Sequence, residues 1–139
     1  MKLIPYLNFA GNAEDAIEFY KNALDGELLM LTRYGESPVQ SAEDEKQKIM
    51  HARIQFGGDN IIMISDTMKG SPFSTNGNIQ LSIGLDDEAK TNEIFNKLSE
   101  GGKVVMPVAK QFWGDIFGML QDKFGVNWML NCTTNVSPF

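Results

Sequence analysis

The stretch "GNAEDAIEFYKNALDGELL", residues 11–29, predicts an amphipathic helix whose two ends are both marked. Asn12 is a suitable N-cap, and the acidic Glu14 and Asp15 favour the positive end of the helix dipole. Gly26 is expected to end the helix. Apolar residues recur at helical spacing and predict a buried stripe of Ala13, Ala16, Ile17, Tyr20, Ala23 and Leu24. Strands are predicted on either side, at residues 3–9 and 27–35.

The second half of the chain repeats this order. A strand at 78–85 precedes a helix that Asp86 and Asp87 begin and that Gly101 and Gly102 stop. Its predicted stripe consists of Ala89, Ile94, Phe95 and Leu98. Tyr20 and Phe95, like Gly26 and Gly101, stand 75 positions apart. Further strands are predicted at 51–58 and 60–66 in the first half, and at 103–108, 116–122 and 126–132 in the second.

A repeat at a fixed period indicates one structural unit used twice. We therefore predict an α+β fold of two paired β-α-β-β-β modules, residues 1–66 and 77–139, which share one core or cleft. Residues 67–76 form the predicted linker. The polar segments 35–48 and 66–77 lack periodicity and are predicted to be loops. Either loop could cover a ligand or simply be mobile, and the sequence leaves their role open.

Composition excludes several classes of function. The formal net charge is −6 and the sequence has no cluster of Lys and Arg, which argues against a nucleic-acid partner. No apolar run is long enough for a signal peptide or a membrane span. The single cysteine, Cys132, excludes an internal disulfide and is interpreted as a small buried hydrophobe. A cytoplasmic location is expected.

Strand alternation predicts which side chains share a face. Apolar residues that should face the helices include Ala52, Ile54, Phe56, Ile79, Leu81, Ile83, Trp128 and Leu130. The opposite faces then carry His51, Arg53, Gln55, Ile61, Met63, Ser65, Asn78, Gln80, Ser82, Asn127, Met129 and Asn131. Polar residues in alternation also fit a plain solvated face. Trp113, with Phe112 and Phe117, could stack on an aromatic ligand or bury a partner chain.

Two stretches, "PYLNFAGNAEDAIEFYKNAL" (5–24) and "FWGDIFGMLQDKFGVNWML" (112–130), resemble the PhnB-like branch of the glyoxalase, bleomycin-resistance and extradiol-dioxygenase (vicinal oxygen chelate) superfamily. The resemblance covers about residues 3–132. It implies two paired modules that form a curled mixed sheet with a cup, and a homodimer. Members of the branch are also labelled demethylubiquinone methyltransferases. No Gly-rich turn joins an early strand to a helix here, so the sequence does not support methyl transfer.

The resemblance also implies where a metal would bind. Metal-dependent members of the superfamily take four ligands from the first and last strands of the modules, and those places fall at Pro5, Met63, Asn78 and Met129. Proline and methionine do not bind a hard divalent cation, and an asparagine amide alone is a weak ligand. His51 is the only histidine of the chain. We therefore expect no metal site and no cofactor.

The main functional expectation is metal-free binding of a small organic molecule in the cup. His51 and Arg53 are the candidate catalytic residues, as proton donor or acceptor and as anion anchor. The candidate ligand-binding residues are Gln55, Met63, Asn78, Gln80, Ser82, Trp113 and Met129. The alternative is a lyase, isomerase or oxygenase acting on a small carbonyl or aromatic compound, with or without a divalent metal at a non-standard site. A third interpretation is an interaction module whose cup is filled by its own side chains.

Overall fold

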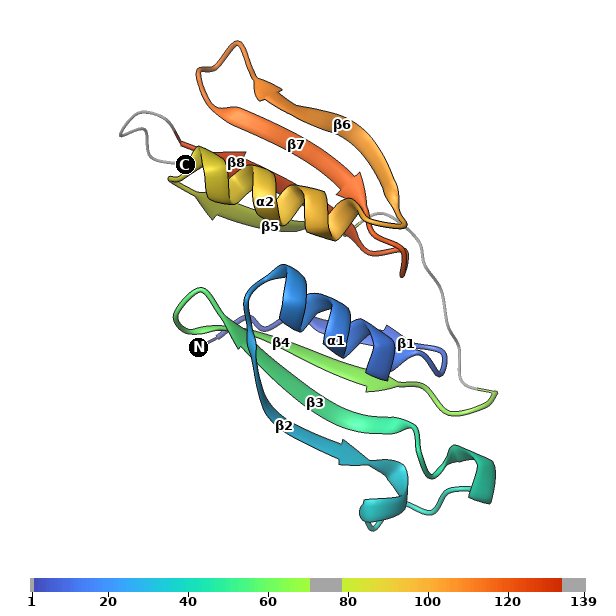
Figure 1. Ribbon diagram of the computed structural model, residues 1–139. Helices are drawn as coiled ribbons and strands as arrows, with labels where there is room; N and C mark the ends of the chain where they lie inside the picture. The colour runs from blue at the N-terminus through green and yellow to red at the C-terminus, as the bar shows by residue number, and fades with distance from the viewer. Residues whose placement is uncertain (1, 71–78, 134–139) are drawn as a thin grey trace. The chain divides into compact units, whose positions relative to one another are not determined.

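The chain folds into two β-α-β-β-β modules (Figure 1). The computed structural model describes residues 2–70 and 79–133. The first module contains β1 (Tyr6–Phe9), α1 (Ala13–Ala23), β2 (Glu27–Arg33), β3 (Ile49–Phe56) and β4 (Asn60–Asp66), with two short 3₁₀ turns, η1 (Tyr34–Glu36) and η2 (Glu43–Glu45). The second contains β5 (Leu81–Leu85), α2 (Glu88–Ser99), β6 (Lys103–Lys110), β7 (Ile116–Gln121) and β8 (Asn127–Cys132). The α+β class and the repeated unit are confirmed.

Each module forms its own four-stranded mixed sheet. The strand order is β1-β4-β3-β2 in the first sheet and β5-β8-β7-β6 in the second. In both sheets the first strand runs parallel to the last, and the other pairs are antiparallel. Contacts divide the chain into two compact units, 1–74 and 75–139, with the boundary inside the predicted linker 67–76. No helix among the described residues is long and apolar enough to cross a membrane.

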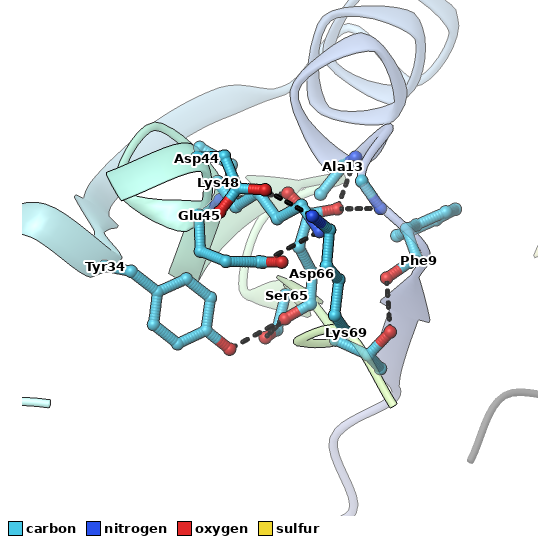
Figure 2. A network of polar contacts seen from close by, with 12 residues as sticks. Phe9, Ala13, Tyr34, Asp44, Glu45, Lys48, Ser65, Asp66 and Lys69 are labelled. Carbon is cyan, nitrogen blue, oxygen red and sulfur yellow. Dashed lines mark hydrogen bonds and ion pairs between the residues drawn. The ribbon is translucent and has the colours of Figure 1, made fainter. Parts of the chain in front are cut away.

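The helix α1 begins where the sequence predicts, with Asn12 at the N-cap position. The Asn12 side chain makes no cap hydrogen bond. Instead, Oδ1 of Asp66 accepts hydrogen bonds from the backbone N–H groups of Gly11 and Ala13, both at 2.9 Å. Asp66 lies at the end of β4 and is only 2% exposed (Figure 2). A carboxylate from a distant strand thus satisfies the N–H of Ala13, one of the orphan donors of the first helical turn, and the N–H of Gly11 just before the helix.

Asp66 also connects the helix to the sheet. Its Oδ2 accepts from the N–H of Ile49 at 2.9 Å, and its backbone carbonyl accepts from the hydroxyl of Tyr34 at 2.8 Å (Figure 2). One buried residue therefore links α1, β3, β4 and the η1 turn. Buried polar groups are tolerated when they are hydrogen-bonded in this way.

Gly26 takes part in ending α1, because its N–H donates to the carbonyl of Lys21 at 2.8 Å, but it is not the left-handed residue of the helix end. The C-cap of α1 is Leu24, and Asp25 takes the left-handed backbone conformation with φ 54°. A Cβ on Gly26 would lie 2.9 Å from Cγ2 of Ile54 and 3.0 Å from the carbonyl oxygen of Gln55. Glycine is required here because the chain passes close to β3 as it enters β2.

The second helix differs from the predicted stripe at one position. Ala89 is exposed, and Thr91 is buried together with Ile94, Phe95 and Leu98. The helix begins at Glu88, so positions 91, 94, 95 and 98 share one face. Thr91 is tolerated there because its hydroxyl donates to the carbonyl of Asp87 at 2.8 Å. The Asp87 side chain caps the helix by accepting from the N–H of Lys90.

Two strands begin later than predicted, and one loop has local structure. The first strand begins at Tyr6 and the fifth at Leu81, so Ile79 lies before its strand and is 73% exposed instead of facing a helix. The expected helix-facing burial of Trp128 and Leu130 is confirmed at 1% and 0% exposure. Cys132 is also buried, with 1% exposure. Segment 35–48, predicted to be a plain loop, contains η1 and η2.

Arg33 ties this β2–β3 connection to α1. Its guanidinium donates to both carboxylate oxygens of Glu14, at 3.1 and 2.6 Å, and to the carbonyl of Gln47 at 2.7 Å. The hydrogen bond from Arg33 lowers the pKa of Glu14 below its ordinary value. Two hydrogen bonds from the planar guanidinium fix the orientation of the Glu14 carboxylate more strictly than a single bond from a lysine would.

Candidate functional site

The open face of the first sheet, opposite α1, carries the candidate residues of this module. We define it by Tyr6, His51, Arg53 and Met63, side chains that alternate with the residues buried beneath the helix. Met63 of β4 pairs with Tyr6 of β1 on one side and with Arg53 of β3 on the other. The strand register thus brings together residues that lie up to 57 positions apart in the sequence.

His51 is hydrogen-bonded on this face. Its Nδ1 lies 3.0 Å from the hydroxyl of Tyr6, and the two ring centroids are 5.6 Å apart. Which of the two groups donates depends on the imidazole tautomer. Tyr6 is 45% exposed, so the pair is accessible from solvent. Sequence reasoning missed Tyr6 because only the parallel pairing of β1 with β4 places it within reach of β3.

Arg53 brings a cation to the same face. It is partly buried, and its Nε has no hydrogen-bond partner among the described residues. Leaving a buried donor of a charged group unpaired costs free energy, of order 1–3 kcal/mol or more. An anionic or carbonyl oxygen placed beside the guanidinium would recover this loss, and the Met63 thioether next to it offers an apolar contact.

Gln55, two residues further along β3, is engaged elsewhere. Its side-chain Nε2 donates to the carbonyl of Gly58 at 2.7 Å, within the β3–β4 turn. The amide therefore stabilises the turn, and a ligand would have to displace this bond to use the same donor. The structure places Gln55 beside Arg53 on the strand but away from the His51–Tyr6 pair.

The second sheet has an equivalent face opposite α2. Register places Ser82 beside Met129, Met129 beside Met119, and Met119 beside Met106. In the first sheet the corresponding row contains Tyr6, Met63, Arg53 and Met30. Ser82 is exposed and Met129 is half-buried. Gln80 is exposed just before β5, and Asn78 lies outside the described residues.

Trp113 lies in the turn between β6 and β7. It is 49% exposed, with its ring centroid 4.9 Å from that of Phe112 and 5.8 Å from that of Phe117 in edge-on contacts. The neighbouring Asp115 accepts from Nδ2 of Asn131 at 3.0 Å, and its carbonyl accepts from the Gln111 N–H. Asp115 therefore holds this turn in place.

The residues at the positions of the superfamily's metal ligands do not fit a hard divalent cation. Pro5 has no side-chain donor, and Met63 and Met129 offer only thioethers. Among residues 2–70 and 79–133, no three His, Cys, Asp or Glu side chains form a group that could hold a metal ion.

Comparisons with known proteins place the chain in a family. The model of the family described as 3-demethylubiquinone-9 3-methyltransferase matches residues 1–131. Protein YjdN of Escherichia coli is 37% identical over 142 residues, covering 94% of this chain and 95% of that protein.

Solved structures agree with this assignment. Protein PA1353 of Pseudomonas aeruginosa is 39% identical with a TM-score of 0.86, covering 95% of this chain and 97% of that one. The PhnB protein of Bacillus cereus is 28% identical with a TM-score of 0.79, over 96% and 100% of the two chains. Likeness in fold alone extends to a glyoxalase, bleomycin-resistance and dioxygenase domain of Frankia, at 12% identity and a TM-score of 0.64, over 94% and 93%. The chain therefore belongs to the family described as 3-demethylubiquinone-9 3-methyltransferase, is similar to the PhnB protein, and has the fold of the glyoxalase, bleomycin-resistance and dioxygenase domains.

Proposed function

We propose that the protein binds a small organic molecule with an apolar body and an anionic or carbonyl group, without a metal ion. Arg53 holds the oxygen of the ligand, and Met63 contacts its body. The unpaired Nε of Arg53 on the open face carries this proposal. Small-molecule sites typically combine a mostly apolar lining with a few convergent polar groups.

The proposal also includes residues of the second module, on and near the open face of its own sheet. Ser82 and Met129 offer a hydroxyl and a thioether on the open face of its sheet, and Gln80 offers an amide near its edge. Trp113 offers a half-exposed ring for stacking on an aromatic ligand. We also propose that the protein is a homodimer in the cytoplasm. The proposal of a homodimer is supported by β6, the edge strand of the second sheet, which exposes the apolar side chains of Val104, Val105 and Met106. A partner subunit would cover this edge.

A thermal-shift titration with benzoate, benzaldehyde and benzyl alcohol tests the binding proposal. A ligand at about 100 times its Kd stabilises the folded state by about 2.7 kcal/mol, which raises the Tm by several degrees. Benzoate or benzaldehyde should raise the Tm, and Arg53→Met should abolish the effect. Lys21→Met is the matched control, because it removes an exposed cation from α1, which packs on the other face of the sheet. Failure of every carboxylate and carbonyl in a broader panel, or an undiminished response of Arg53→Met, would contradict the proposal.

The hydrogen bond between Tyr6 and His51 favours a second candidate, an enzyme that moves a proton next to a carbonyl group. In this function His51 takes or gives the proton, Tyr6 orients the imidazole, and Arg53 stabilises the developing negative charge. Incubation of the protein with small ketones in D₂O, followed by NMR, measures exchange at the carbon beside the carbonyl. His51→Gln should abolish catalysed exchange and Tyr6→Phe should slow it. An unchanged rate in His51→Gln would exclude this role.

Methyl transfer, which the family description names, receives no support from the turn between β1 and α1. This turn contains one glycine, Gly11, and the carboxylate of Asp66 already occupies the N–H groups at the start of α1. A cofactor carboxylate or phosphate would meet a buried negative charge at that helix end.

A further inference from the structure

A second candidate site lies at the β2–β3 connection, away from the open face. A solvent-open cavity of about 780 Å³ is formed between this connection and the segment that follows β4. None of Tyr6, His51, Arg53 and Met63 lines it. Its walls include Tyr34, Pro38, Val39, Glu45, Met68 and Lys69. The cavity is thus partly apolar, and its wall carries one carboxylate, Glu45, and two lysines, Lys46 and Lys69.

Glu45 is the unusual residue of this cavity. It is only 2% exposed, and neither of its carboxylate oxygens has a hydrogen-bond partner among the described residues. Oε2 lies 2.8 Å from Nζ of Lys48, an ion pair by distance without the angles of a hydrogen bond. Oε1 has no hydrogen-bond partner among the described residues. A buried acceptor left unpaired is costly, so Oε1 is a site at which a donor gains free energy by binding.

The two lysines that line the cavity, Lys46 and Lys69, are paired with carboxylates other than Glu45. Lys69 forms an ion pair with Asp44, which joins the loop to the segment after β4 (Figure 2). This hydrogen bond lowers the pKa of Asp44 and raises that of Lys69. Lys46 pairs with Glu43 at 3.0 Å. Glu45 therefore remains the group with acceptor capacity to spare.

We propose that this cavity binds a small organic cation, a primary amine or guanidine with an apolar body. An N–H of the ligand donates to Oε1 of Glu45, and the apolar body packs against Tyr34, Val39 and Met68. A charge-assisted hydrogen bond of this kind is stronger than a neutral one, which selects the cation over an alcohol of the same shape. The proposal does not depend on the function of the open face.

Titration of ¹⁵N-labelled protein with n-butylammonium chloride, followed by amide chemical shifts, tests this site. Saturable shifts are expected for residues 34–46, 68 and 69, and none for His51 or Arg53. n-Butanol and butyrate, which share the apolar body, should bind at least tenfold more weakly. Equal binding of butanol, or shifts confined to other parts of the chain, would overturn the proposal.

Two variants test the role of the carboxylate. Glu45→Gln should weaken butylammonium binding about tenfold, since it removes the charge and one acceptor. Asp59→Asn is the control, because Asp59 is exposed in the turn between β3 and β4 and does not line the cavity, and it should bind as the wild type does. If Glu45→Gln fails to fold, Ala42→Phe, which places a larger side chain in the cavity wall, should block binding instead. Unchanged affinity in a folded Glu45→Gln or in Ala42→Phe would refute the site.

Discussion

Asp66→Asn tests whether one buried carboxylate holds the first module together. In the wild type, Oδ1 accepts from Gly11 and Ala13 and Oδ2 accepts from Ile49, each at 2.9 Å. Asparagine has nearly the same shape but only one acceptor atom. Its amide group must then face an N–H donor, most simply that of Ile49, with donor against donor.

The expected loss follows from these three contacts. Leaving one buried N–H unpaired costs about 1–3 kcal/mol, and removing the charge weakens the two remaining bonds as well. We expect Asp66→Asn to lower the free energy of unfolding by about 3 kcal/mol. Single domains are typically stable by about 5–15 kcal/mol, so the variant should still fold.

The chain allows the two modules to be followed separately. All three tyrosines, Tyr6, Tyr20 and Tyr34, lie in the first module, and both tryptophans lie in the second. Urea unfolding monitored by second-derivative absorbance of tyrosine therefore reports on the module that contains Asp66. With an m-value of about 2 kcal/mol/M, a loss of about 3 kcal/mol shifts the midpoint by about 1.5 M.

A matched control is available in the same module. Asp59 is exposed in the turn between β3 and β4, and Asp59→Asn should change the stability by less than about 0.5 kcal/mol. If the free energy of unfolding of Asp66→Asn differs from that of the wild type by less than about 0.5 kcal/mol, the carboxylate contributes no net stability and the reasoning from its hydrogen bonds is wrong.

Three further predictions concern other contacts. Asp122→Asn should lower stability by about 2–3 kcal/mol, because it disrupts the 2.9 Å bond from Nε1 of Trp128 to a 3% exposed carboxylate, and tryptophan fluorescence during urea unfolding measures the loss. Glu14→Gln should lower the Tm more at pH 7 than at pH 3, because Arg33 lowers the pKa of the Glu14 carboxyl below its ordinary value of 4.5, and the resulting stabilisation decreases as the pH falls toward that lowered pKa. An equal loss at both pH values would contradict this. Gly102→Ala should destabilise by about 1–3 kcal/mol in chemical denaturation, because its Cβ would lie 2.3 Å from a backbone oxygen of β7; wild-type stability would refute the clash.

Much of the fold could be predicted from local patterns. Helical spacing located both helices, and alternation in β3 and in the first part of β8 correctly separated buried Ile54 and Trp128 from their neighbours. These signals are local because the side chains of one element share a face at fixed spacing. The prediction failed at Ala89, which helical spacing puts on the opposite side of α2 from Leu98, and Ala89 is exposed. It failed at Ile79 because β5 begins later, at Leu81.

The candidate site could be predicted only in part. Alternation placed His51, Arg53 and Met63 on one face, but not Tyr6, whose contact with His51 depends on how β1 pairs with β4. No pattern in the sequence predicted that Glu45 is buried, because an acidic residue in a polar segment normally indicates a solvated loop.

By itself, the amino-acid sequence determined the order of the elements, the repeated module and the family, since each depends on residues near one another in the chain. Only the tertiary structure decided which distant groups meet. Asp66 caps a helix that begins 53 residues before it, and the side chain of Asn12, the local candidate, does not. The physical reason is that a buried carboxylate in a fixed position satisfies several backbone donors at once, and that position exists only after the sheet has paired.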